Sequence, residues 1–130
     1  MPITVKRIPG EPIIIAKFTG ELAAADVVEM FTRSVEIAKD IEGTVYRISD
    51  VQELEATFTE TMKTVQAAVK GMAGSTNDPR IYVMFVGSTQ WVAFYRNALQ
   101  TKEFGGVHLP VFASEEAALE HIRLHREEQL

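Results

Sequence analysis

Carboxylates are the most concentrated reactive groups in this chain. Asp50, Glu53, Glu55 and Glu60 stand close together, around a segment, 51–56, that we expect to be a loop. Paired carboxylates can exchange protons with a substrate or hold a divalent cation. The sequence places no histidine, lysine or serine partner beside them, and charged side chains usually face water. A solvated acidic loop is therefore the favoured interpretation, and a small enzyme that uses this loop is an alternative.

Two histidines have a spacing that suits a metal. His121 and His125 stand four residues apart, so both could face one ion from a single helix. The residues between them lack the glutamate of a zinc-protease motif, and no third ligand is evident. The sequence therefore predicts two solvated histidines, no metal site and no cofactor.

Thr57 begins the best helix start in the chain. The run Thr57-Phe58-Thr59-Glu60 fits a capping box, in which Thr57 bonds the amide three residues on and Glu60 reaches back. A phosphate on Thr57 would also be favoured there, at the positive end of the helix dipole. The capping box explains these residues without modification, so a cap is favoured and a phosphosite is the alternative.

Aromatic residues are in surplus on one predicted helix, 88–101. Trp91, Phe94 and Tyr95, with Leu99, cover more than one face of that helix, whereas one face suffices to reach a core. The surplus could line a pocket or form an exposed apolar patch. The alternative is a core helix that also packs on its neighbours. With Phe58, these are the candidate ligand-binding residues.

These candidates depend on elements that alternate along the chain. Apolar runs predict strands over 3–8, 13–18, 44–48, 81–86 and 109–112, and apolar residues at helical spacing predict helices over 22–41, 57–72, 88–101 and from 114 onward. Such alternation is typical of right-handed βαβ units. We expect one α/β domain over 1–130, with a five-stranded mixed sheet, its first two strands antiparallel, and four helices. The proline in the last strand predicts a sheet edge.

Composition excludes several classes of protein. The net charge of −5, without a basic run, argues against nucleic-acid binding. The absence of cysteine excludes disulfides and thiolate catalysis. No signal peptide is visible, and the longest apolar run, 81–86, is too short for a transmembrane segment. We expect a soluble, cytoplasmic protein.

Four short motifs carry a resemblance to a known family: Ile48-Ser49-Asp50 at the end of the third strand, Val86-Gly87 followed by Trp91, Val111-Phe112 in the last strand, and Ser114-Glu115-Glu116 at the start of the last helix. With the order β-β-α-β-α-β-α-β-α, the chain resembles the SpoIIAA-like (STAS-fold) family, related to anti-sigma-factor antagonists. The resemblance implies a compact β-α superhelix without enzymatic activity.

The resemblance also implies where a phosphate would go. Phosphorylatable STAS domains carry a serine or threonine after the third strand, in an Asp-Ser-Ser-Gly-like element. This sequence has a longer, acidic segment there, 50–57, so Thr57 and Ser49 are the nearest candidates. The divergent SpoIIAA-like branch looks closer, and for that branch the resemblance implies binding of an apolar ligand or a membrane surface.

The leading hypothesis is thus a non-enzymatic binding or regulatory domain. It would bury an apolar small molecule, a lipid or a partner helix against Trp91, Phe94 and Tyr95. One alternative is a phospho-regulated switch that docks a protein partner, and another is the small enzyme described above. We expect a homodimer, formed through the first helix or the last strand.

Overall fold

The predicted α/β class is confirmed. The computed structural model describes residues 3–21, 23–55, 57–68, 78–87, 93, 97 and 110–128. Its elements are, in order, β1 (Ile3–Arg7), β2 (Ile13–Glu21), α1 (Ala24–Ala38), β3 (Val45–Glu55), α2 (Phe58–Ala68), β4 (Ile81–Val86), β5 (Val111–Phe112) and α4 (Glu115–Glu128). The described residues thus contain three helices rather than the four expected, because nearly all of the helix predicted over 88–101 lies outside them.

The five strands form one mixed sheet in the order β1-β2-β3-β4-β5. β1 and β2 are antiparallel, as predicted, and every later pair is parallel. β5 pairs with β4 at one end of the sheet, which confirms the expected edge position of the last strand. β4 lies between β3 and β5, and its continuous apolar run is buried on both faces.

β3 is longer than the sequence indicates, and the predicted acidic loop is wrong. Residues 51–55 continue the strand, because β2 also continues and pairs with them, after a register shift between Lys17 and Thr19. Glu53 and Glu55 remain exposed, as solvated charges should. Parallel pairing therefore decides the structure of a segment whose own residues favour a loop.

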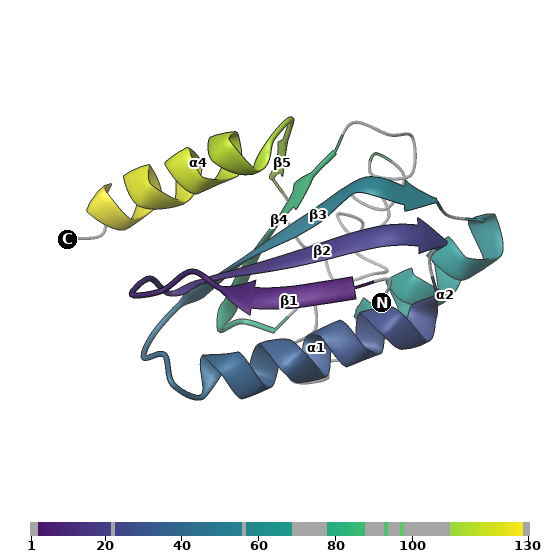
Figure 1. Cartoon of the computed structure of the whole chain (residues 1–130), viewed down its shortest axis with the longest axis horizontal. Coiled ribbons are helices and arrows are strands. Elements are labelled where there is room, and N and C mark those ends of the chain that lie inside the picture. The colour runs from purple at the N-terminus through teal and green to yellow at the C-terminus, as the bar shows by residue number, and fades with distance from the viewer. Residues whose placement is uncertain are drawn as a thin grey trace.

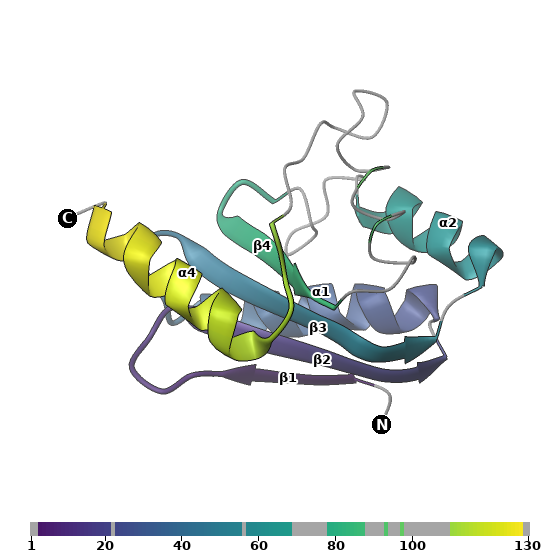
Figure 2. The same cartoon turned by 90° about the horizontal axis from the view of Figure 1, so that it is seen from above.

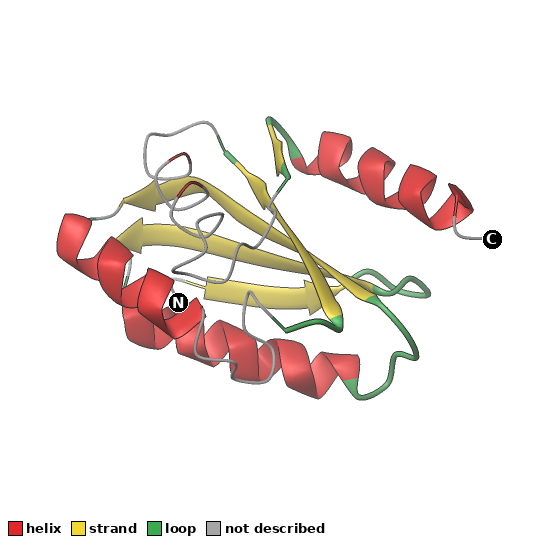
Figure 3. Ribbon diagram, turned by 180° about the vertical axis from the view of Figure 1, so that it is seen from behind, coloured by secondary structure: helices red, strands yellow, loops and turns green. Residues whose placement is uncertain are grey.

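The helices cover the two faces of the sheet unequally (Figures 1 and 2). α1 lies against β1 and β2 on one face and also contacts α2. α4 lies across the opposite face, mainly on β3, β4 and β5. Figure 3 shows α1 and α2 from behind, on the side of the sheet away from α4. On the sheet face that α4 covers, the part formed by β1 remains uncovered, and its side chains, Thr4 and Lys6 among them, are exposed.

The core under α1 contains a buried charge. Arg47 of β3 is 0% exposed, and its Nη1 donates a hydrogen bond to Ser34 Oγ of α1 at 3.2 Å. The guanidinium carbon also lies 5.3 Å from the centroid of the Phe31 ring. Ser34 Oγ in turn donates to the Met30 carbonyl at 2.8 Å. A buried guanidinium is costly unless it is bonded, so the hydrogen bond to Ser34 offsets part of that cost and links β3 to α1.

α4 is held by apolar packing and by a cap. Ala118 and Ile122 are fully buried against the side chains of β2, β3 and β4. Ser114 caps the helix, since its Oγ accepts a hydrogen bond from the Ala117 amide at 3.1 Å. Arg123 pairs with Glu11 in the β1–β2 turn at 3.0 Å. α4 therefore bridges from the last strand to the first hairpin.

Candidate functional site

A pair of carboxyl groups joins β3 to the first turn of α4. In the sheet, Lys17 of β2 lies opposite Asp50 of β3. Asp50 is only 2% exposed, and the Glu115 side chain from α4 hydrogen-bonds to it. Gln52 donates to Asp50 Oδ1 from its backbone amide at 3.1 Å and from its side chain at 3.2 Å. The fold thus brings Asp50 together with a glutamate from the far end of the chain.

Their contact moves the pKa values of the two carboxyl groups apart. The hydrogen bond with Asp50, followed by burial and the charge of Asp50, raises the pKa of Glu115 from 4.5 to about 7. Burial would raise the pKa of Asp50, but hydrogen bonds from Glu115 and Gln52 outweigh that effect and lower it. At neutral pH Asp50 is therefore the carboxylate, and Glu115 is the group that gains or loses the proton.

A groove opens beside this pair, over the half of the sheet that α4 leaves exposed. Its volume is about 370 Å³, within the range of ligand sites. Side chains of β1, β2, the hairpin turn and α4 line it: Thr4, Lys6, Arg7, Ile8, Pro9, Ile15, Lys17 and Glu115. Thr4 pairs with Lys17, and Lys6 pairs with Ile15, so these four share one face. The groove is therefore cationic over a partly apolar floor, with Glu115 among its lining residues.

Lys17 is the link between the groove and the carboxyl pair. Its Nζ lies 3.3 Å from Glu53 Oε2, and this contact raises the Lys17 pKa. Lys17 also acts on Asp50 and Glu115, where its charge lowers both pKa values. Arrayed in this way, the residues can bind an anion and hold or release one proton.

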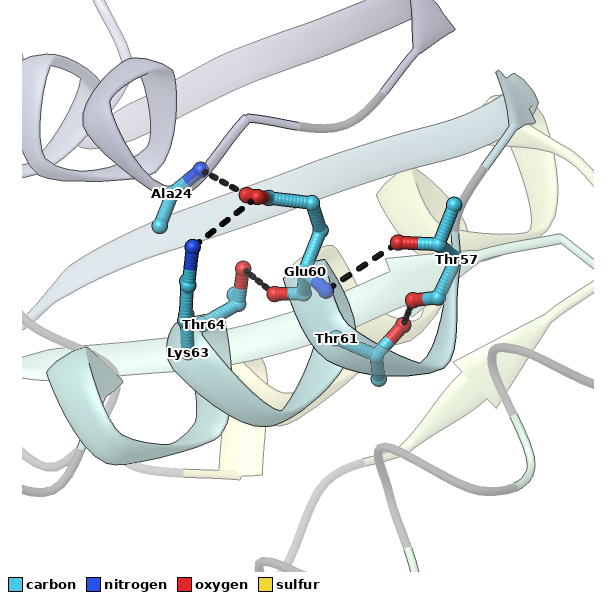
Figure 4. Close-up of polar contacts among 6 residues, drawn as sticks. All are labelled: Ala24, Thr57, Glu60, Thr61, Lys63 and Thr64. Atoms are coloured by element: carbon cyan, nitrogen blue, oxygen red, sulfur yellow. Dashed lines mark hydrogen bonds and ion pairs between the residues drawn. The ribbon is translucent and has the colours of Figure 1, made fainter.

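The Thr57 cap is confirmed, but only half of the predicted capping box forms. Thr57 Oγ1 accepts a hydrogen bond from the Glu60 amide at 3.1 Å, as Figure 4 shows. The Glu60 carboxylate turns away from Thr57 and accepts from the Ala24 amide of α1 at 3.1 Å, with Lys63 3.4 Å away. These bonds, the Ala24 amide first, lower the pKa of Glu60. Glu60 therefore ties the start of α1 to α2, and Thr57 remains exposed.

The two other phosphate and metal candidates are buried or packed. Ser49 is 2% exposed inside β3, so a kinase would reach it only after local opening. His121 and His125 are half-buried rather than solvated: the His121 Nε2 lies 3.2 Å from the Tyr82 hydroxyl, and the His125 ring is 5.1 Å from the Tyr82 ring. No cluster of three metal-ligating side chains occurs among the described residues.

The aromatic candidates stay predictions. Trp91, Phe94, Tyr95 and Leu99 lie outside the described residues, and nothing is described of the Phe58 side chain. Sequence analysis also missed Glu115 as a site residue, because a glutamate in the first turn of a helix already has a local explanation. In the described part of the chain, no helix is long and apolar enough to cross a membrane.

Comparisons with known proteins agree on the fold. No family model and no curated protein matches the sequence. An uncharacterized DUF3478-family protein with a SpoIIAA-like fold, from Shewanella loihica PV-4, is 15% identical, with a TM-score of 0.58 over 91% of this chain and 90% of that one. The anti-sigma factor antagonist SpoIIAA, in its unphosphorylated form, is 17% identical, with a TM-score of 0.57 over 93% of this chain and 96% of its own. The expected SpoIIAA-like fold is thus confirmed.

Proposed function

We propose that this chain is a non-enzymatic regulatory domain that receives a protein partner in the groove between the β1–β2 hairpin and α4. The groove carries the proposal: it is an open site of about 370 Å³ that gathers Lys6, Arg7 and Lys17 on a chain of net charge −5. SpoIIAA, which shares the fold, is an anti-sigma factor antagonist, a regulator of another protein. That role supports binding of a partner over catalysis here.

The carboxyl pair is better suited to binding than to acid–base catalysis. Catalysis needs a substrate held against the proton-transfer group, with a nucleophile or an activated water in place. Asp50 is buried beneath Gln52 and Glu115, and only Glu115 of the pair reaches the groove. Besides Glu115, the groove offers cations, a threonine and apolar side chains. A lining of this composition is suited to binding a charged surface of a protein partner.

Site-specific crosslinking tests this function. A photoreactive amino acid at Thr4 lies in the groove, and the same group at Thr32, an exposed position of α1, reports on the opposite face. In cells of the source organism, one protein should crosslink from Thr4 and not from Thr32, and Lys6→Glu should abolish that crosslink. Identical crosslinks from both positions, or a crosslink that survives Lys6→Glu, would refute the groove as the docking site.

A phosphate switch at Thr57 is the second candidate. The observation that favours it is the exposed Thr57 cap, whose expected partner carboxylate, Glu60, points to Ala24 instead. A phosphate on Thr57 could accept hydrogen bonds from the first amides of α2 without a carboxylate beside it. Intact mass after incubation with kinases of the source organism tests it: Thr57→Ala should abolish a phosphate that Thr59→Ala leaves in place. Unchanged mass of the unmodified protein would count against the switch.

A further inference from the structure

The cations in the groove are spaced to match an extended peptide. Lys6 lies opposite Ile15 in the hairpin, and Lys17 is two residues beyond Ile15, so the two lysines are diagonal neighbours on one face. Diagonal neighbours in a sheet are about 7–8 Å apart. Alternate side chains of an extended strand are separated by about 7 Å. Carboxylates at alternate positions of a bound strand could therefore meet both lysines at once.

We infer that the partner segment in this groove is an acidic peptide in extended conformation, and that Glu115 weakens its binding when it loses its proton. The acidic side chains would lie on Lys6 and Lys17 and pass over Ile15 between them, while the intervening residues of the peptide would point away from the sheet. Since this rests on the proposed docking of a partner in the groove, its test uses defined peptides, whereas crosslinking from Thr4 tests docking of any protein.

Charge complementarity selects the acidic occupant. Lys6 has no ion-pair partner among the described residues, whereas Lys17 pairs with the exposed Glu53, at 3.3 Å, and lies opposite Asp50. Arg7 donates from Nε to the Glu11 carbonyl and keeps its charge. A nucleic acid would also bring negative charge, but a long polyanion would meet the net charge of −5 outside this short groove. An acidic peptide needs contact only with the groove.

Glu115 makes the groove sensitive to pH. The charged groups that face it are Asp50 on β3, Lys17 on β2, and Lys6 and Arg7 across the groove on β1. When Glu115 is protonated, the residues that line the groove carry three cations and no carboxylate, and Glu115 can donate a hydrogen bond. When it ionises, a second carboxylate stands beside Asp50 and repels an acidic ligand. The pKa of about 7 places this change in the physiological range.

Fluorescence anisotropy with labelled probes tests the inference on the full chain. The probe is an eight-residue peptide in which Glu alternates with Leu, compared with a peptide in which Lys alternates with Leu, and with a single-stranded oligonucleotide. We expect the acidic peptide to bind best. Lys6→Glu should weaken it about five- to tenfold, whereas Lys39→Glu, the same charge change at an exposed position beyond α1, should leave it within about twofold. Circular dichroism checks that each variant is folded. If Lys6→Glu does not fold, Lys6→Ala replaces it in the binding measurement.

The pH dependence tests the role of Glu115. The affinity for the acidic peptide should fall as the pH rises through 7, and Glu115→Gln should remove that fall, whereas Glu116→Gln should not. Absence of acidic-peptide binding, an equal effect of Lys6→Glu and Lys39→Glu, or tighter binding of the oligonucleotide would overturn the acidic partner. The same pH profile in Glu115→Gln as in the unmodified protein would overturn the role of Glu115.

Discussion

The free energy of unfolding of this protein should fall as the pH rises from mildly acidic to mildly basic. The pKa of Glu115 is raised from 4.5 to about 7 in the folded state. Between these values the folded protein holds a proton that the unfolded chain has released. That proton stabilises the fold fully below the unfolded pKa, and the stabilisation is lost as the pH rises through the folded pKa. The pKa of Asp50 is lowered from its ordinary value of 3.8, so its protonation changes the free energy of unfolding only below that pH. Asp50 therefore does not contribute to the change that Glu115 causes.

The expected magnitude follows from the pKa difference. Each pH unit between the two pKa values is equivalent to about 1.4 kcal/mol, so the interval from 4.5 to about 7 has an upper limit of about 3.4 kcal/mol. Glu115 is only half-buried, and solvent screens its repulsion from Asp50 once both are ionised. We therefore expect a loss of about 1–2 kcal/mol across this range. Glu115→Gln cannot lose a proton but can still donate to Asp50, so it should flatten the profile.

Urea unfolding followed by circular dichroism at several pH values measures this profile. The matched control is Glu116→Gln, which makes the same charge change in the same first turn of α4, at an exposed position. The control should keep the slope of the unmodified protein, and only Glu115→Gln should lose it. If all three proteins show parallel profiles, Asp50 does not raise the pKa of Glu115, and the reasoning from their contact is wrong.

Three other changes probe the packing that positions the site. Ser34→Ala should lower the free energy of unfolding by about 1.5 kcal/mol in urea, because it removes an acceptor from a buried guanidinium; a loss below about 0.5 kcal/mol would contradict that link. Ile122→Ala, at a position 0% exposed, should cost about 2–4 kcal/mol, whereas Leu124→Ala, at a position 53% exposed, should cost little; equal losses would mean that α4 packs differently. Glu60→Ala should speed hydrogen exchange at the Ala24 amide, and an unchanged rate by NMR would refute the bond between the helices.

The strands at the centre of the sheet could be predicted because their own residues demand burial. The run Ile81–Val86 is apolar at every position, and only a strand covered on both faces buries all of it. The end of β3 could not be predicted in this way. Gln52, Glu53 and Glu55 are poor strand formers, and they are extended because the second half of β2 pairs with them. Which strand continues beside another is a long-range property that local propensity does not contain.

The helix caps also differ in whether their hydrogen-bond partners are local in sequence. Thr57 and Ser114 each bond an amide three residues ahead, so short sequence windows contain both partners. Glu60 also stands in such a window, yet its carboxylate bonds an amide from another helix. The local partner and the distant partner are both backbone N–H groups at a helix start, and only the packing of α1 on α2 decides between them.

The carboxyl pair shows how a local explanation can hide a site. Glu115 and Glu116 both suit the positive end of the α4 dipole, and by that argument they are equivalent. Their positions relative to the apolar stripe differ, however: Ala118 and Ile122 follow Glu115 at the three- and four-residue spacing of one helix face, and both are fully buried. A carboxyl group on a stripe that faces a sheet must find a partner there or keep its proton. The sequence already contained that constraint, but the identity of the partner, Asp50, required the fold.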